Sequence, residues 1–179
     1  MHYTSRLLAG ALLLAAPAAF AQASATVANV PATARIFKPI SLTLSNSGLS
    51  FGDIFSDATG GTVTLNPQTD VRTTGGPTLA TTGTVNSALF TVGGKRNATY
   101  AITLPANGIV TLTGTGTAMP VGTFTASVGG AAPSTTATGL IPNVAAGTQT
   151  FKVGATLTIG ANQTDGDYAG TFNVTVAYN

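Results

Sequence analysis

Few side chains in this sequence could perform chemistry. The 179 residues contain no Cys, no Trp and a single His, His2. All five acidic residues are Asp, at positions 53, 57, 70, 165 and 167. Nucleophilic triads require an imidazole, zinc sites require His or Cys, and redox thiol chemistry requires Cys. We therefore expect no enzyme, no cofactor and no metal site.

Two groups of Asp residues still merit a chemical interpretation. Asp53 and Asp57 could act as the paired carboxylates of a glycosidase, but the chain lacks Glu and a Trp platform for sugars, which favours a solvated loop. Asp165-Gly166-Asp167 could offer oxygens to Ca²⁺, but two carboxylates are few for that ion, which favours a turn.

The charge pattern excludes one class of partner. The net charge is only +2, and Lys95-Arg96 is the only adjacent basic pair in residues 22–179. A nucleic-acid interface needs a wider basic patch, so we expect none. Because glycines precede this pair, we interpret it as the charged tip of a hairpin.

Residues 1–21 have the pattern of a secretory signal peptide. A short basic region ends at Arg6, an apolar stretch covers residues 7–16, and Ala19-Phe20-Ala21 forms a cleavage motif. The apolar stretch is too short to span a membrane, and no later stretch approaches the length needed. We expect cleavage before Gln22, export to the cell surface or medium, with periplasmic retention as the alternative, and no membrane span.

Nearly every other segment alternates apolar and polar residues with a period of two. About ten short strands result, separated by turns rich in Gly, Pro, Asn and Ser. The pattern predicts an all-β antiparallel sandwich over 40–179, with a closed barrel as the alternative. It predicts a hairpin over 100–113 and one closing strand over 168–178. It also predicts long connections over 66–84, with at most a short strand near Val71, and over 129–148.

Residues 22–39 form a separate extended segment. Val30, Ala32, Ala34 and Ile36 alternate with polar or bulkier residues on the opposite side. An extended terminus has unpaired backbone groups, which must pair with its own sheet or with another chain, or remain disordered. Two readings stay open: the first strand of its own sheet, or a donor strand for a neighbouring subunit.

Three stretches carry a resemblance to a known family. They are the motif Leu49-Ser-Phe51-Gly52, the run from Val153 to Gln163, and the closing run from Gly166 to Tyr178. Together they resemble the bacterial secreted domain of unknown function family 4402, over roughly 32–179. More weakly, the two ends resemble spore-coat-U-type and archaic chaperone–usher pilins.

The pilin resemblance has specific implications. It implies an immunoglobulin-like, pilin-like sandwich in which a C-terminal strand borders a groove that receives a donor strand. Tyr168, Phe172, Val174 and Val176 would form the groove edge, and Val30, Ala32, Ala34 and Ile36 would belong to the donor. The implied partners are like subunits, a periplasmic chaperone and an outer-membrane usher.

Two functions follow from these observations. The first is a structural subunit of a surface fibre or extracellular matrix that assembles by β-strand addition. The second is a monomeric secreted module that binds a polysaccharide or a protein. A hydrolase that uses Asp alone is only a formal third.

Overall fold

The computed structural model describes residues 24–179, and contacts group residues 36–179 into one compact unit. The predicted signal peptide lies outside the described residues. Residues 24–39 form no strand, and residues 24–179 contain no helix, hence none that could cross a membrane. The predicted all-β, antiparallel character is confirmed.

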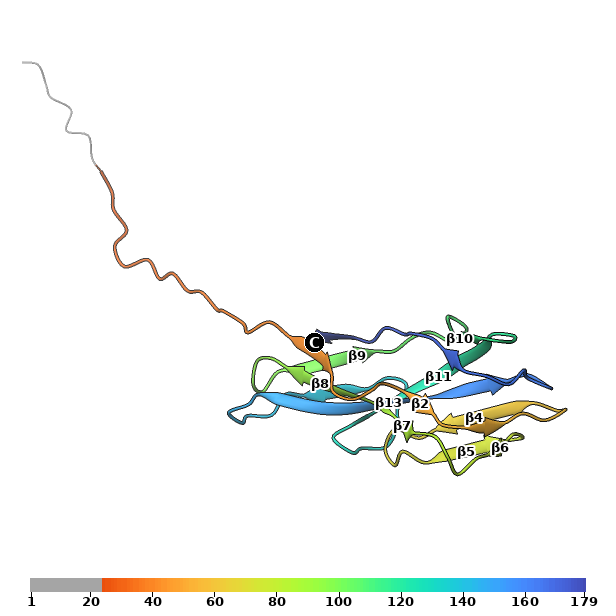
Figure 1. The fold of residues 1–179 in the computed structure, drawn as a ribbon. Helices are drawn as coiled ribbons and strands as arrows, with labels where there is room; N and C mark the ends of the chain where they lie inside the picture. The colour runs from red at the N-terminus through yellow and green to blue at the C-terminus, as the bar shows by residue number, and fades with distance from the viewer. Residues whose placement is uncertain (1–23) are drawn as a thin grey trace, which may run out of the picture. The chain divides into compact units, whose positions relative to one another are not determined.

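The described residues form fifteen strands, several of only two residues (Figure 1). They are β1 (Ser41–Leu44), β2 (Ser50–Phe51), β3 (Ile54–Phe55), β4 (Gly61–Leu65), β5 (Arg72–Gly75), β6 (Thr78–Leu79), β7 (Val85–Asn86), β8 (Ala88–Gly93), β9 (Thr99–Thr103), β10 (Val110–Gly114), β11 (Met119–Val128), β12 (Thr138–Leu140), β13 (Thr148–Ile159), β14 (Tyr168–Ala169) and β15 (Thr175–Tyr178).

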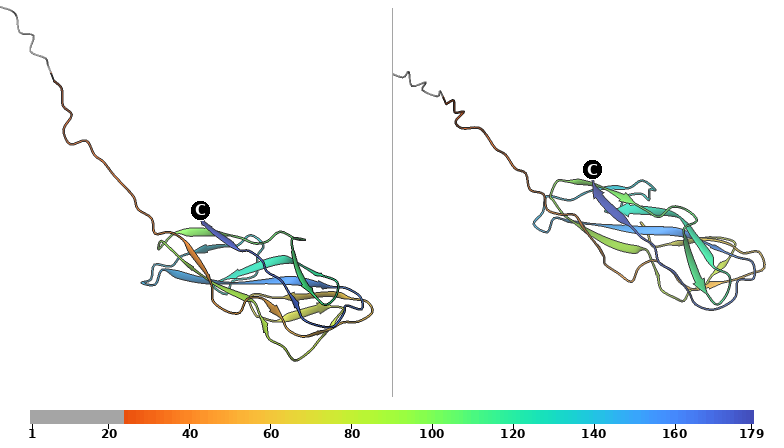
Figure 2. Two further views of the ribbon diagram at one scale, coloured as in Figure 1. Left: turned by 45° about the horizontal axis from the view of Figure 1, so that its top comes forward. Right: turned by 90° about the horizontal axis from the view of Figure 1, so that it is seen from above.

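The long strand β13 organises the largest sheet, whose order is β1-β8-β13-β11-β10-β14. One edge of β13 pairs with β8 over Thr148–Val153 and then with β4 over Thr156–Ile159, while the other edge pairs with β11. The strand runs lengthwise through the unit in both views of Figure 2. Its twelve residues extend over roughly 36 Å at about 3.3 Å per residue.

Three smaller sheets complete the unit. Strand β9 lies between β12 and β15, β2 pairs with β7, and β3 pairs with β6. The pairing β5–β4 extends the large sheet sideways. Strand β5 lies where the sequence allows a short strand near Val71, whereas β6 in the connection 66–84 and β12 in the connection 129–148 are additional to the predicted strands.

The predicted hairpin over 100–113 is wrong. Strand β9 pairs with β12 and β15, whereas β10 pairs with β11 and β14. Both edges of β9 are therefore occupied, and β10 forms its hairpin with β11 instead. The turn between β9 and β10 is also tied elsewhere, because the Thr123 backbone N–H donates to Asn107 Oδ1 at 2.6 Å.

The predicted hairpin tip at Lys95-Arg96 is also wrong. The strand before it, β8, pairs with β1 and β13, and the strand after it, β9, belongs to the three-stranded sheet. Lys95 and Arg96 thus lie in a turn that connects two sheets. The closing run 168–178 is likewise split, because residues 170–174 between β14 and β15 have no strand assignment.

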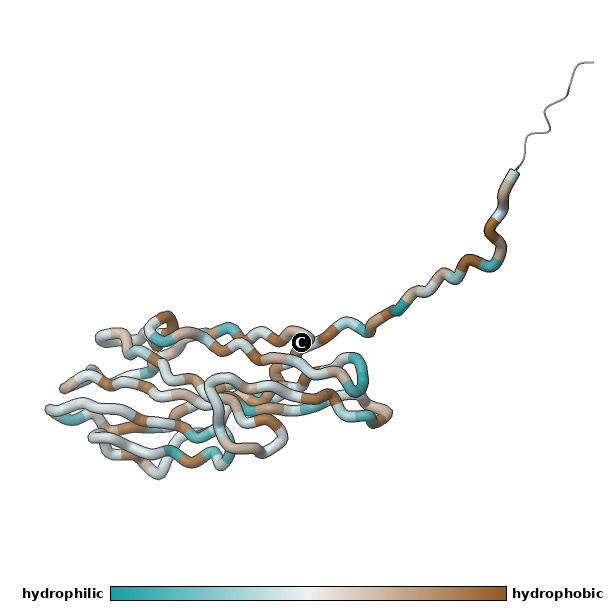
Figure 3. Tube along the Cα trace, turned by 180° about the vertical axis from the view of Figure 1, so that it is seen from behind, coloured by the Kyte–Doolittle hydropathy of each residue, from teal (hydrophilic) through white to brown (hydrophobic). Residues whose placement is uncertain are grey.

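Apolar residues that alternate along the strands supply one core (Figure 3). The largest fully buried side chains include Tyr100 of β9 and Phe151 of β13, and the Phe151 ring stacks on Phe90 at 5.1 Å between centroids. Gly139 of β12 lies against the Tyr100 ring, where any Cβ would collide with it. Strands from different sheets thus contribute to the same core.

Tyr100 generates a prediction about pH. Its hydroxyl donates to Gln149 Oε1 at 2.9 Å, and burial raises its pKa to about 12. The unfolded chain releases this proton near pH 10, whereas the folded chain keeps it. Stability is therefore complete below pH 10 and declines as pH rises through 12, by up to roughly 2–3 kcal/mol.

The variant Tyr100→Phe keeps the ring but has no proton to lose. We expect its free energy of unfolding, measured by urea denaturation from pH 9 to 12, to decline less steeply than that of the unchanged chain. Parallel declines would contradict the assignment of this pH dependence to Tyr100.

Candidate apolar groove between two unpaired strand edges

A groove of about 950 Å³ opens between the early strands β2 and β3 and the segment that contains β14. Strands β2 and β3 each have one partner, β7 and β6, and β14 has one partner, β10. Each of these strands therefore leaves one edge without a ladder in the described chain. Residues 49–56 and residues 162–172 line the groove from opposite sides.

The first wall is held in place by an arginine behind it. Arg72 of β5 donates from Nη1 to the carbonyl oxygens of Phe51 at 2.6 Å and Asp53 at 3.0 Å, and from Nη2 to the carbonyl of Ala80 at 2.7 Å. Gly52, with φ of +66°, makes the turn between β2 and β3 beside this guanidinium. One cation thus fixes the course of the chain from β2 to β3.

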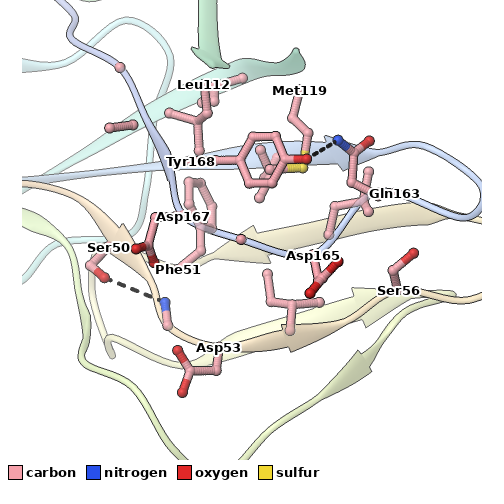
Figure 4. Close-up of a pocket in the computed structure, with 18 of the residues that line it drawn as sticks. Ser50, Phe51, Asp53, Ser56, Leu112, Met119, Gln163, Asp165, Asp167 and Tyr168 are labelled. Carbon is pink, nitrogen blue, oxygen red and sulfur yellow. Dashed lines mark hydrogen bonds between the residues drawn. The ribbon is translucent and has the colours of Figure 1, made fainter. Parts of the chain in front are cut away.

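Tyr168 anchors the second wall (Figure 4). Its hydroxyl accepts from Gln163 Nε2 at 2.8 Å and donates to the Thr164 carbonyl at 2.8 Å. Its ring lies against Gly114 of β10, where a Cβ would come within 2.9 Å of the ring carbons. These contacts hold the loop before β14 against the sheet.

The floor of the groove belongs to the core. It consists of apolar side chains from β10, β11 and β13: Val110, Leu112, Met119, Val121, Leu157 and Ile159. Leu112 is half-buried, and the others are at most 7% exposed. Phe172 joins this floor from the second wall, with its ring 5.2 Å from that of Phe124. The floor of the groove is therefore apolar and largely buried, with Leu112 as its more exposed member.

Three carboxylates stand at the rim. Asp53 comes from the first wall, and Asp165 and Asp167 come from the second, all three exposed (Figure 4). The neighbouring Asp57 serves its own turn, because hydrogen bonds from the Thr59 hydroxyl and from the N–H groups of Thr59 and Gly60 lower its pKa. Residues 165 and 166 form a bend before β14, as predicted for a turn.

Not every predicted groove-edge residue lies at the groove. Tyr168 and Phe172 line it. Val174 and Val176 are half-buried against the core further toward the C-terminus, and Val176 pairs with Ile102 of β9. In the proposed donor segment, Val30 is 69% exposed and Ile36 is 95% exposed, and residues 24–39 have no ladder partner in the described chain.

No signal in the sequence indicates the first wall or the role of Arg72. The motif Leu49-Ser-Phe51-Gly52 predicts an early strand but does not reveal which of its edges lacks a partner. Within residues 24–179, His, Cys, Asp and Glu nowhere gather in threes that could hold a metal ion.

Arg72 provides a test of how the first wall is held. Arg72→Met removes three charge-assisted hydrogen bonds and leaves three carbonyl oxygens without this donor, so we expect a loss of about 2 kcal/mol in unfolding free energy. Amide hydrogen exchange of residues 50–56 should accelerate. The matched control, Arg96→Met on an exposed turn, should leave both measurements unchanged, and equal effects of the two variants would contradict this role.

Sequence comparison places the chain within a family. No curated protein and no solved structure matches the chain. The sequence profile of the family described as Domain of unknown function (DUF4402) matches residues 40–178 and thus covers all fifteen strands. The chain therefore belongs to the DUF4402 family.

Proposed function

We propose that this protein is an exported structural subunit whose copies assemble by β-strand addition into a surface fibre or matrix. The N-terminal segment of one copy would enter the groove of another and pair with the two unpaired edges. The observation that carries the proposal is the groove itself. Strand edges without a ladder partner can form main-chain hydrogen bonds with an added extended segment.

The length of the segment supports this assignment. Eight residues, Leu49–Ser56, form the first wall, which would span about 23 Å if fully extended and is shortened by the turn at Gly52. Val30 to Ile36 extends over about 20 Å at the same rise. Pro31 and Pro39 lack the N–H donor, which limits the pairing run to the residues between them.

The side-chain pattern supports it as well. Val30, Ala32, Ala34 and Ile36 would all point to one face of an added strand, where the apolar floor lies. Burial of such apolar surface contributes a favourable free energy of about 25 cal/mol for each Å² removed from water. The opposite face, with Thr33 and Arg35, would remain in solvent.

The finer architecture and location belong to the same proposal. The large sheet and the three-stranded sheet share one core, which supports an immunoglobulin-like, pilin-like sandwich over 40–179. Export would follow from a cleaved signal peptide at 1–21, with residues 22–39 as the donor segment. A periplasmic chaperone and an outer-membrane usher are the proposed assembly partners, and the lack of His, Cys and Glu after residue 21 argues against an enzyme.

Substitutions at two adjacent positions test which face of the segment enters the groove. Ala34→Asp places a charge on the face proposed to enter the apolar groove, at a cost of several kcal/mol, which corresponds to at least about 100-fold weaker association. Thr33→Asp adds the same charge to the opposite face. Size exclusion and electron microscopy of residues 22–179 should show assemblies for the unchanged chain and for Thr33→Asp, but not for Ala34→Asp.

A second pair of variants completes this test. Ile36→Asp should behave like Ala34→Asp, and deletion of residues 22–35 should leave a folded monomer. Assemblies that form equally well in all variants, or a monomer in every case, would overturn strand addition. A monomeric unchanged chain that binds a polysaccharide would favour the binding-module alternative.

A further inference from the structure

The charged residues of the compact unit 36–179 separate by sign toward its two ends. Strand β13 spans the unit from Thr148 to Ile159. At its first end, Thr148 pairs with Gly93 of β8, and Gly93 pairs in turn with Ser41 of β1. Lys38 precedes Ser41 by three residues, and Lys95 and Arg96 follow Gly93 after one intervening residue, Gly94. We call this the basic end.

Contacts confirm that these cations gather there. Ile36, Lys38, Lys95 and Arg96 line one shallow depression together with residues 145–147. The Lys95 ammonium lies 4.1 Å from the centre of the Phe37 ring, and the Tyr178 hydroxyl accepts from the Lys95 N–H and donates to the Lys38 carbonyl, both at 2.8 Å.

The opposite end of β13 is surrounded by carboxylates. Ile159 pairs with Gly61 there, and the loop that follows β13 carries Asp165 and Asp167. Asp57 lies just before Gly61, and its carbonyl accepts from the Asn162 N–H at 2.7 Å. Asp53 is not counted at this end, because its carbonyl accepts from Arg72, which lies between the ends, so Asp57, Asp165 and Asp167 supply three negative charges here. We call this the acidic end, roughly 36 Å of strand away from the basic end.

The charged side chains of Asp70, Arg72 and Lys152 lie between the two ends and bind groups within the unit. Lys152 of β13 pairs with Asp70, and Arg72 donates to three backbone carbonyls. Burial by itself raises the pKa of Asp70, but hydrogen bonds from Lys152 and Ser87 outweigh it and lower the pKa overall. Within residues 36–179, no carboxylate forms an ion pair with Lys38, Lys95 or Arg96.

From this separation we propose that successive copies join with the basic end of one against the acidic end of the next. The partner is thus a second copy of this chain, and the inference rests on the proposed strand addition. Its consequence is a direction. The donor segment leaves its own unit at Ile36, at the basic end, so it enters the neighbour's groove from the acidic rim.

The direction also fixes the strand pairing. Residues 168–178 run from the acidic end to the basic end, whereas β1 to β3 run the opposite way. With Ile36 at the neighbour's acidic rim, the donor chain from Val30 to Ile36 runs toward the acidic end. It is therefore antiparallel to β14 and β15 and parallel to β2 and β3. Like ends repel, so the charges exclude both head-to-head and tail-to-tail order.

Charge reversal tests the pairing of the ends. In the full chain from residue 22, Lys95→Glu/Arg96→Glu makes both ends acidic, and Asp165→Lys/Asp167→Lys makes both basic. Since complementary charge raises association rates by 10-fold to 1000-fold, each double variant should assemble at least about 10-fold more slowly in 20 mM salt, measured by light scattering. The combined four-fold variant should recover to within about 3-fold, and 300 mM salt should reduce all differences.

Because the sequence has no Cys, a single introduced Cys is the only thiol available for disulfide cross-linking. Ala145 and Ala161 are exposed at the basic and acidic ends. A mixture of Ala145→Cys and Ala161→Cys chains should form heterodimeric disulfides on mild oxidation, while Ala145→Cys alone should not. Self-cross-linking of Ala145→Cys, or no heterodimer in the mixture, would overturn the proposed order.

The two proposals fail in different ways. If Ala34→Asp blocks assembly but the charge-reversed chains assemble at the unchanged rate, strand addition stands and the end-to-end electrostatic order falls. If Ala34→Asp assembles normally while the charge-reversed chains do not, the ends associate without strand addition.

Discussion

The strand edges without a ladder partner in the described chain are the constraint on which the open groove depends. A peptide N–H or C=O that faces neither a partner nor water costs free energy comparable to a lost hydrogen bond. Strands β2, β3 and β14 each pair on one side only, and residues of all three line one groove. The groove combines an apolar, largely buried floor with walls that carry exposed carboxylates.

The rest of the fold holds this opening apart. Arg72 fixes the course of β2 and β3 from behind, and Tyr168 fixes the opposite loop through Gln163 and Thr164. Strand β13 ties the large sheet together and separates the two charged ends. Rigid walls matter because a strand that docks between preformed edges has less ordering to offset than one that must first assemble its site.

Much of the fold could be predicted from alternation alone. The runs at 40–44, 62–65, 88–92 and 151–159 become strands because β-branched and apolar residues repeat with a period of two. Partner choice could not be predicted in this way. Tyr100 to Thr113 resembles a hairpin locally, yet β9 has both edges occupied by β12 and β15, whose partners lie far along the chain.

For the candidate site, too, some features follow from the sequence and others only from the tertiary structure. By itself the sequence determined an all-β chain and a separate alternating N-terminal segment, because residue types and periodicity are local properties. The resemblance to pilins implied a groove edge at Tyr168 and Phe172. Only the tertiary structure decided that residues 49–56 face residues 162–172 across an open groove, that Val174 and Val176 lie beyond it, and that unlike charges occupy opposite ends. Those facts depend on which strand edges remain unpaired, and strand pairing between distant segments is a property of the whole fold.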